Sequence, residues 1–143
     1  MPYEFLEDVA TADIAFRAWG KNLHELFQAA GDATINVMIE DLDTIELQQQ
    51  RTFSLENDAL DMLLFNFLQE FIYYKDSEQL LLRASQVEIE NKNTQYQLTA
   101  FTQGEKLDAD RHQQRVDVKA VTLHRFELKK TDDGWTAMVI LDI

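Results

Sequence analysis

An apolar stripe at helical spacing between residues 60 and 72 constrains the fold of this chain more than any other feature. Its members recur every three or four residues: Leu60, Leu63, Leu64, Phe67, Leu68, Phe71 and Ile72. A face this broad must be covered by another layer of secondary structure. Asn57 can cap such a helix, and Asp58 and Asp61 suit the positive N-terminal end of its dipole. We therefore expect a helix that is buried against a sheet.

A second helix is predicted from residue 22 to residue 38. Asn22 is a plausible N-cap, and Glu25 three residues later resembles a capping box. Apolar and small side chains again recur every three or four residues, at Leu23, Leu26, Phe27, Ala30, Thr34, Val37 and Met38. This pattern predicts an amphipathic helix with one face toward a core.

Strands are predicted for most of the remaining chain, because apolar and polar residues alternate there with a period of two. Hairpin turns are expected at residues 91–93 and at 131–134, where an Asp-Gly pair tolerates positive φ. Consecutive strands joined in this way pair antiparallel. We predict an α+β fold, a single compact domain over residues 1–143 with a largely antiparallel sheet covered by two helices. The expected strands span residues 3–7, 14–19, 44–55, 80–90, 95–102, 116–128 and 135–141.

The charge balance narrows the range of partners. The chain of 143 residues has 13 Lys and Arg against 26 Asp and Glu, a formal net charge of -13. Because phosphate contacts need clustered basic residues, general or sequence-specific nucleic-acid binding is not expected. Residues 106–130 differ, with seven basic residues against four acidic ones. This basic segment could meet a phosphate or an acidic partner, or could simply be solvated.

The sequence also indicates where the protein works. No run approaches the ~20 apolar residues that cross a bilayer. The first residues lack the basic region and apolar stretch of a signal peptide. We therefore expect a cytoplasmic protein without a membrane partner.

Several classes of active site are absent from the sequence. The absence of Cys excludes a disulfide scaffold, a thiolate zinc site and a Cys nucleophile. The glycines at positions 20, 31, 104 and 134 are too scattered to form a phosphate-binding loop. None of the three serines lies in a nucleophile elbow, and the three His show no metal-binding spacing.

The end of the sequence offers a candidate cation site. Leu141-Asp142-Ile143 follows directly on an apolar strand, so a terminal carboxylate would lie close to the Asp142 side chain. Two neighbouring carboxylates repel unless a cation or donor joins them. A third acidic residue would complete an oxygen-rich site for a hard cation such as calcium, and the residues alone do not identify it.

Several segments in order resemble the archease family. The strongest runs from Gly104-Glu105 through Asp108 and Arg111-His112 to the stretch 118–124, Val-Lys-Ala-Val-Thr-Leu-His. The others are Thr11-Ala12-Asp13-Ile14, Arg17-Ala18-Trp19-Gly20 with the start of the following helix, residues 63–70, Trp135 and the ending Leu141-Asp142-Ile143. Each piece alone is weak, but the ordered set covers the whole chain.

The resemblance implies that this protein works through a partner rather than as an enzyme. Archeases assist the RtcB-type RNA ligase, which joins tRNA halves and repairs broken RNA. They promote guanylylation of the ligase and so allow multiple turnover. The family fold is a compact α+β domain.

The resemblance also assigns residues. Asp13 matches the aspartate of the family's Thr-Ala-Asp motif, which helps bind a divalent cation, seen as calcium, and Asp142 and Ile143 match the other ligands. Lys119 matches a lysine that matters for activation. One departure is Ala10, where many archeases have a His directly before the motif.

Two other classes of function remain open. One is a small metal-dependent hydrolase that acts on nucleotides at the carboxylate cluster. The other is a chaperone-like module that binds many proteins.

Overall fold

The computed structural model describes residues 2–7 and 13–143. Within them, helices and strands follow one another as β1 (Tyr3–Leu6), β2 (Asp13–Gly20), α1 (Leu23–Met38), the 3-10 turn η1 (Leu42–Thr44), β3 (Gln49–Asn57), α2 (Leu60–Glu78), β4 (Leu80–Lys92), β5 (Gln95–Lys106), β6 (Ala120–Val121), β7 (Glu127–Thr131) and β8 (Gly134–Asp142). No described helix has both the length and the apolar character that crossing a membrane requires.

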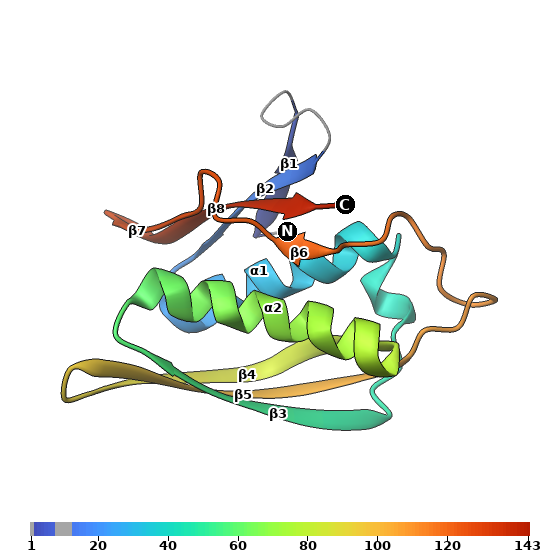
Figure 1. The fold of residues 1–143 in the computed structure, drawn as a ribbon, viewed down its shortest axis with the longest axis horizontal. Helices are drawn as coiled ribbons and strands as arrows, with labels where there is room; N and C mark the ends of the chain where they lie inside the picture. The colour runs from blue at the N-terminus through green and yellow to red at the C-terminus, as the bar shows by residue number, and fades with distance from the viewer. Residues whose placement is uncertain (1, 8–12) are drawn as a thin grey trace.

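The strands form two antiparallel sheets with both helices between them (Figure 1). The upper sheet has the order β1-β2-β8-β6, and β7 pairs with another part of β8. The lower sheet has the order β3-β5-β4. The predicted α+β class is confirmed. The strands divide into two sheets where the sequence pattern suggested one, because alternation shows that a strand has a buried face but not which sheet it joins.

The helices fill the space between the sheets. The predicted apolar face of α2 is confirmed, since Leu63, Leu64, Phe67, Leu68, Phe71 and Ile72 are all buried. Helix α1 is buried more extensively, because it packs on β2 above and on β4 below. Small residues let the two helices approach closely, and the ring of Phe71 lies against Gly31. A side chain at Gly31 would meet that ring.

Of the two predicted N-caps, Asn22 is confirmed and Asn57 is wrong. At α1, the amide of Glu25 donates to Oδ1 of Asn22 at 2.9 Å, and Glu25 Oε2 accepts from the amide of Lys21 at 2.8 Å. At α2 the N-cap is Ala59, without a side-chain cap. The predicted cap Asn57 instead accepts from the amide of Ala59, in the turn before the helix.

Two predicted strands are shorter than expected. The strand expected at 44–55 begins only at Gln49, after η1. The strand expected at 116–128 is wrong for most of its length, since only β6 and the start of β7 are extended and paired. Leu123 is 61% exposed, and Arg125 has a φ of 55°, which no strand accommodates. The alternation in this segment therefore does not mark a buried face.

Gly104 provides a test of how tightly the lower sheet is packed. A Cβ at this position would overlap the main-chain carbonyl oxygen of Leu81 on β4. Gly104→Ala should therefore lower the free energy of unfolding by about 3 kcal/mol, because backbone has to move. Ser54→Ala, at an exposed position of β3, is the control and should change it little. Equal stabilities of the two variants in urea titrations would contradict the packing.

Candidate functional site

The first and last long strands of the upper sheet bring two predicted site residues together. Strands β2 and β8 pair antiparallel along their whole length, and Asp13 is directly opposite Asp142. On the other side of β8, Ala120 of β6 is opposite Asp142. Directly opposed residues of an antiparallel pair have Cβ atoms about 5 Å apart on the same face. The two carboxylates are therefore neighbours at one end of the sheet.

Both carboxylates lie on the outer face of the upper sheet. Phe16 and Ala18 of β2, and their partners Val139 and Ala137 of β8, belong to the core between the sheets. Because side chains alternate along a strand, Asp13 and Asp142 point away from that core. Both residues are partly exposed. Like charges that are directly opposed destabilise a strand pair in general, and a cation between them would offset that effect.

Main-chain contacts bring Lys119 to the same place. Its amide donates to the carbonyl oxygen of Asp142 at 2.8 Å, while its side chain is exposed. Helix α2 fixes the chain on both sides of it. Lys75 Nζ donates to the carbonyl oxygen of Val118 at 3.3 Å, and the amide of Val121 donates to Oε1 of Gln69 at 2.9 Å. Lys119 therefore has a fixed backbone and an accessible ammonium group.

The residues present fit a hard cation. Within residues 2–7 and 13–143 no group of three or more His, Asp or Glu side chains has metal-binding geometry. A cation at this end would need the carboxylates of Asp13 and Asp142 together with main-chain oxygens of Ile143. Carboxylate and main-chain oxygens are the ligands that calcium prefers. Ala10, and the Thr11 and Ala12 of the Thr-Ala-Asp motif, lie outside the described residues.

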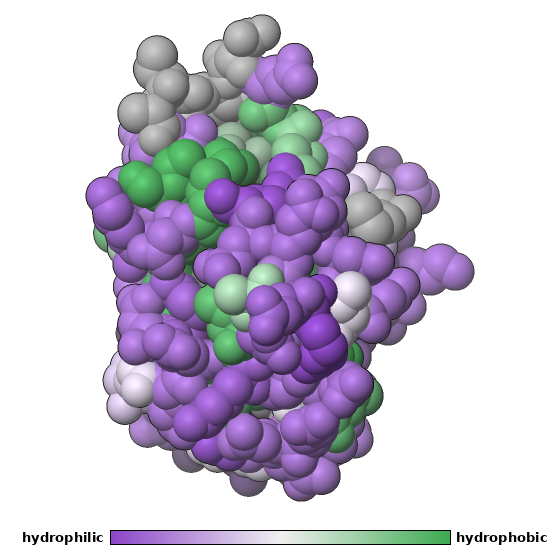
Figure 2. Space-filling model, turned by 90° about the vertical axis from the view of Figure 1, so that its right-hand side faces the viewer, coloured by the Kyte–Doolittle hydropathy of each residue, from purple (hydrophilic) through white to green (hydrophobic). Residues whose placement is uncertain are grey.

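The surface at this end is mostly polar. Figure 2 views the molecule from the side toward which β8 points, and shows largely hydrophilic side chains with a hydrophobic area in the upper part. Ile143 is half-buried and packs against the core, so the end of β8 is anchored. The carboxylates thus project from a fixed strand end.

The predicted motif around Glu105 and His112 has a structural role that the sequence did not reveal. His112 is 1% exposed and Glu105 is 4% exposed. The amide of Asp108 donates to Nδ1 of His112 at 2.9 Å, which places the ring proton on Nε2, and Nε2 donates to Oε2 of Glu105 at 3.1 Å. The amide of Glu46 also donates to that oxygen, at 2.6 Å, and Arg111 pairs with the other one.

The hydrogen bonds and ion pair of Glu105 fix the start of the segment that leads to Lys119. Burial by itself raises the pKa of Glu105, but the hydrogen bonds from the Glu46 amide, Arg111 and His112 lower it more. The net effect is a pKa below the ordinary value, so the folded protein favours the charged carboxylate. The spacing from Glu105 to His112 could have suggested a paired acid and base, although not their burial. His124 is exposed and lies in the loop between β6 and β7.

Comparison with known proteins identifies the family. A model described as "Archease protein family (MTH1598/TM1083)" matches residues 3–143. The archease of Pyrococcus abyssi is 37% identical over 134 residues, covering 93% of this chain and 94% of its own. The chain belongs to the archease family. The archease of Methanosarcina barkeri is also 37% identical, over 142 residues that cover 99% of this chain and 95% of the relative.

Solved structures agree with the fold. The solution structure of Methanobacterium thermoautotrophicum protein 1598 has a TM-score of 0.86 and 33% identity, and the match covers 99% of each chain. The crystal structure of a Thermotoga maritima archease, described as a possible chaperone, has a TM-score of 0.56 and 18% identity, covering 94% of this chain and 93% of the other. The second likeness supports the fold alone.

The Glu105 network predicts a pH dependence of stability. A carboxyl with a lowered pKa stabilises the folded state above its unfolded pKa, and this contribution disappears as the pH falls through the folded pKa. Glu105→Gln should therefore lower the free energy of unfolding at neutral pH by about 2 kcal/mol and flatten its decline in acid. Glu56→Gln, which is exposed on β3, is the control. Parallel stability-pH curves for Glu105→Gln and the wild type would contradict this account.

Proposed function

We propose that this archease activates an RtcB-type RNA ligase, of the kind that splices tRNA and repairs RNA, by promoting its guanylylation and so its multiple turnover. The observation that supports this is the position of Asp13 opposite Asp142, beside the exposed Lys119, at an accessible end of the upper sheet. Membership of the family and the absence of nucleotide-binding loops agree with an accessory role in the cytoplasm rather than an enzymatic one.

The carboxylate end would act as a docking surface. Asp13, Asp142 and Ile143 would hold a divalent cation, with calcium the leading candidate because all the donors are oxygen atoms. Such a cation would supply positive charge that offsets the repulsion between the two carboxylates. The strand pair then presents its end to the ligase in one defined conformation. Because β2 and β8 are both central strands of the sheet, this conformation is fixed before the ligase arrives.

Lys119 would act on the ligase directly. Its backbone is fixed by Asp142, and the neighbouring chain by α2, so the side chain needs little ordering when a partner binds. A preorganised ammonium group could favour the ligase conformation in which the nucleotide phosphates and metal are aligned for attack. This is positioning catalysis supplied by a second protein.

The direct experiment is a turnover assay. A trace of the cognate ligase is mixed with excess broken tRNA, GTP and divalent metal, with and without this protein. We expect about one round of ligation per ligase without the protein and continued ligation with it. Equal product in both reactions would overturn the proposal.

Two alternative functions would each give a different experimental result. A nucleotide hydrolase would release phosphate from GTP without any ligase. A chaperone-like module, which is how the Thermotoga maritima protein is described, would capture many unrelated proteins in a pull-down. The outer carboxylate pair does not favour either over the accessory role.

The carboxylate pair should be essential to activation. Asp13→Ala removes one of two opposed acids, and therefore both a candidate cation ligand and a repulsion. We expect the initial rate of ligase guanylylation to fall at least about tenfold, a change of roughly 1.4 kcal/mol in the barrier, while the fold survives. Asp58→Ala, at an exposed position in the turn before α2, is the matched control. Full activation by Asp13→Ala would show that the pair is not central.

Lys119 should affect activation without affecting the fold. Its exposed side chain is not used in the main-chain bond to Asp142, so Lys119→Ala should leave the melting temperature unchanged. Guanylylation should again fall at least about tenfold, a change of roughly 1.4 kcal/mol in the barrier, because one positioned charge is lost. Lys119→Arg should restore part of the rate, and Lys92→Ala on the lower-sheet hairpin is the control. A wild-type rate for Lys119→Ala would assign the activation to other residues.

A further inference from the structure

Two adjoining hollows lie outside the carboxylate end, one on the outer face of the upper sheet and one at the far end of that sheet. Both helices lie on the other face of this sheet, as Figure 1 shows. One hollow, of about 760 Å³, lies over β8 between β1 and β7, and the second, of about 530 Å³, lies at the far end of β2 and β8. Thr131 and Thr136 line both, so the two hollows adjoin, and together they are called the depression below.

The larger hollow, called the basic groove below, is lined by basic and apolar side chains. Arg17, Arg125 and Lys129 line it, together with one acidic residue, Glu127, and the apolar side chains of Leu6 and Met138. The Arg17 and Lys129 side chains are 54% and 61% exposed, and their ion pairs with Glu4 and Glu127 are loose, at 3.8 and 3.5 Å. Three of the 13 Lys and Arg side chains of the chain therefore line this one hollow.

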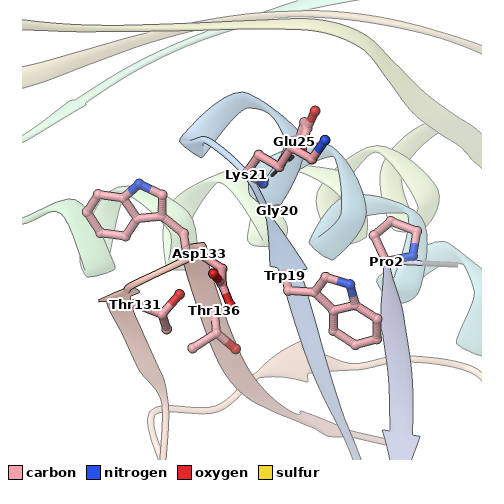
Figure 3. A pocket seen from close by; sticks show the side chains of 9 residues that line it. Pro2, Trp19, Gly20, Lys21, Glu25, Thr131, Asp133 and Thr136 are labelled. Carbon is pink, nitrogen blue, oxygen red and sulfur yellow. Dashed lines mark hydrogen bonds between the residues drawn. The ribbon is translucent and has the colours of Figure 1, made fainter.

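The smaller hollow contains both tryptophans of the chain. Trp19 and Trp135 line it, together with the charged residues Lys21, Glu25 and Asp133. Trp135 packs against the core, whereas Trp19 is 40% exposed although it lies on a central strand. Figure 3 shows the Trp19 indole beside Pro2, with Thr131 and Thr136 coming from the neighbouring strands. Trp, Arg and Met are the residues enriched in protein interfaces, and Trp and Arg dominate the binding energy there.

We infer that this depression binds an acidic segment of the partner protein, whose carboxylates contact Arg17, Arg125 and Lys129 and whose apolar side chain enters the tryptophan hollow. The inference rests on the proposed function, in that the partner is the RNA ligase. The argument for an acidic occupant is charge complementarity within the groove. A nucleic acid fits less well, because its phosphates would contact the basic side chains alone and leave the apolar side chains of Leu6 and Met138 unused.

The groove and the carboxylate end can contact one partner at the same time. Arg17 is on the same face of β2 as Asp13 and four residues along it, a separation of about 13 Å. Trp19 follows two residues further in the same direction. A protein of ordinary interface size that reaches the carboxylates therefore also covers the groove.

The test is direct binding to the immobilised ligase, without RNA, over a range of salt concentrations. Arg17→Gln/Lys129→Gln removes two exposed charges of the groove and leaves both tryptophans in place. We expect about tenfold weaker binding with a shallower salt dependence, as for interfacial charge pairs. Lys92→Gln/Lys106→Gln removes the same charge from exposed positions on the lower sheet and should bind like the wild type. Circular dichroism confirms that both variants are folded.

A zero-length carbodiimide cross-link identifies the contact itself. The reagent activates a partner carboxylate, which forms an amide with the Lys129 amine as the reagent leaves as a urea. Mass spectrometry should show Lys129 joined to an Asp or Glu of the ligase, and Lys92 not joined.

Three results would overturn the inference, and they separate it from the proposed function. Wild-type affinity in Arg17→Gln/Lys129→Gln, with no cross-link at Lys129, overturns the groove alone. Failure of the wild type to bind the ligase overturns the proposed function as well. Binding of an oligouridylate to the protein alone, followed by tryptophan fluorescence and lost in the double variant, makes the groove a nucleic-acid site.

Discussion

The pairing of β2 with β8 is the interaction on which the rest of this structure depends. It joins the second strand of the sequence to the last one at the centre of the upper sheet, and its register extends over eight residue pairs from Asp13–Asp142 to Gly20–Trp135. Inward, the paired side chains form the upper half of the core. Outward, the same register arranges the two carboxylates, Arg17 of the basic groove and Trp19 along one face. A shift by one residue would exchange these two faces, so packing of the core also fixes the outer surface.

The helices have a second role besides filling the core. Helix α2 lies between the sheets and contributes Lys75 and Gln69, which hold the chain before and after Lys119. Glu105, at the end of β5, fixes the start of the same long segment through His112 and Arg111. An otherwise irregular stretch is thus held at several points by buried or half-buried polar contacts. This explains how a residue outside any long strand can have a defined position beside Asp142.

Local sequence patterns predict the elements of this fold better than their assembly. The stripe of α2 and the Asn22 cap are direct consequences of helical spacing and capping, and both are present in the structure. The division into two sheets depends on which faces meet across the helices, and no local pattern encodes that.

The segment 116–128 was not predictable as a loop, because its alternating apolar residues include the exposed Val116 and Leu123. The approach of Asp13 to Asp142 is a long-range register, which the resemblance to archeases suggested and which spacing alone left open. The metal role of these residues stays a prediction.

The most direct test of the central claim is a calcium titration by calorimetry of the wild-type protein and of Asp142→Asn. If the β2–β8 register creates a cation site, the wild type binds one calcium ion with measurable heat. Asp142→Asn, which has the same size and the same main-chain bonds, then binds at least about tenfold more weakly because a charged ligand is lost. Binding of equal strength by both proteins, or no binding by the wild type, would contradict the account.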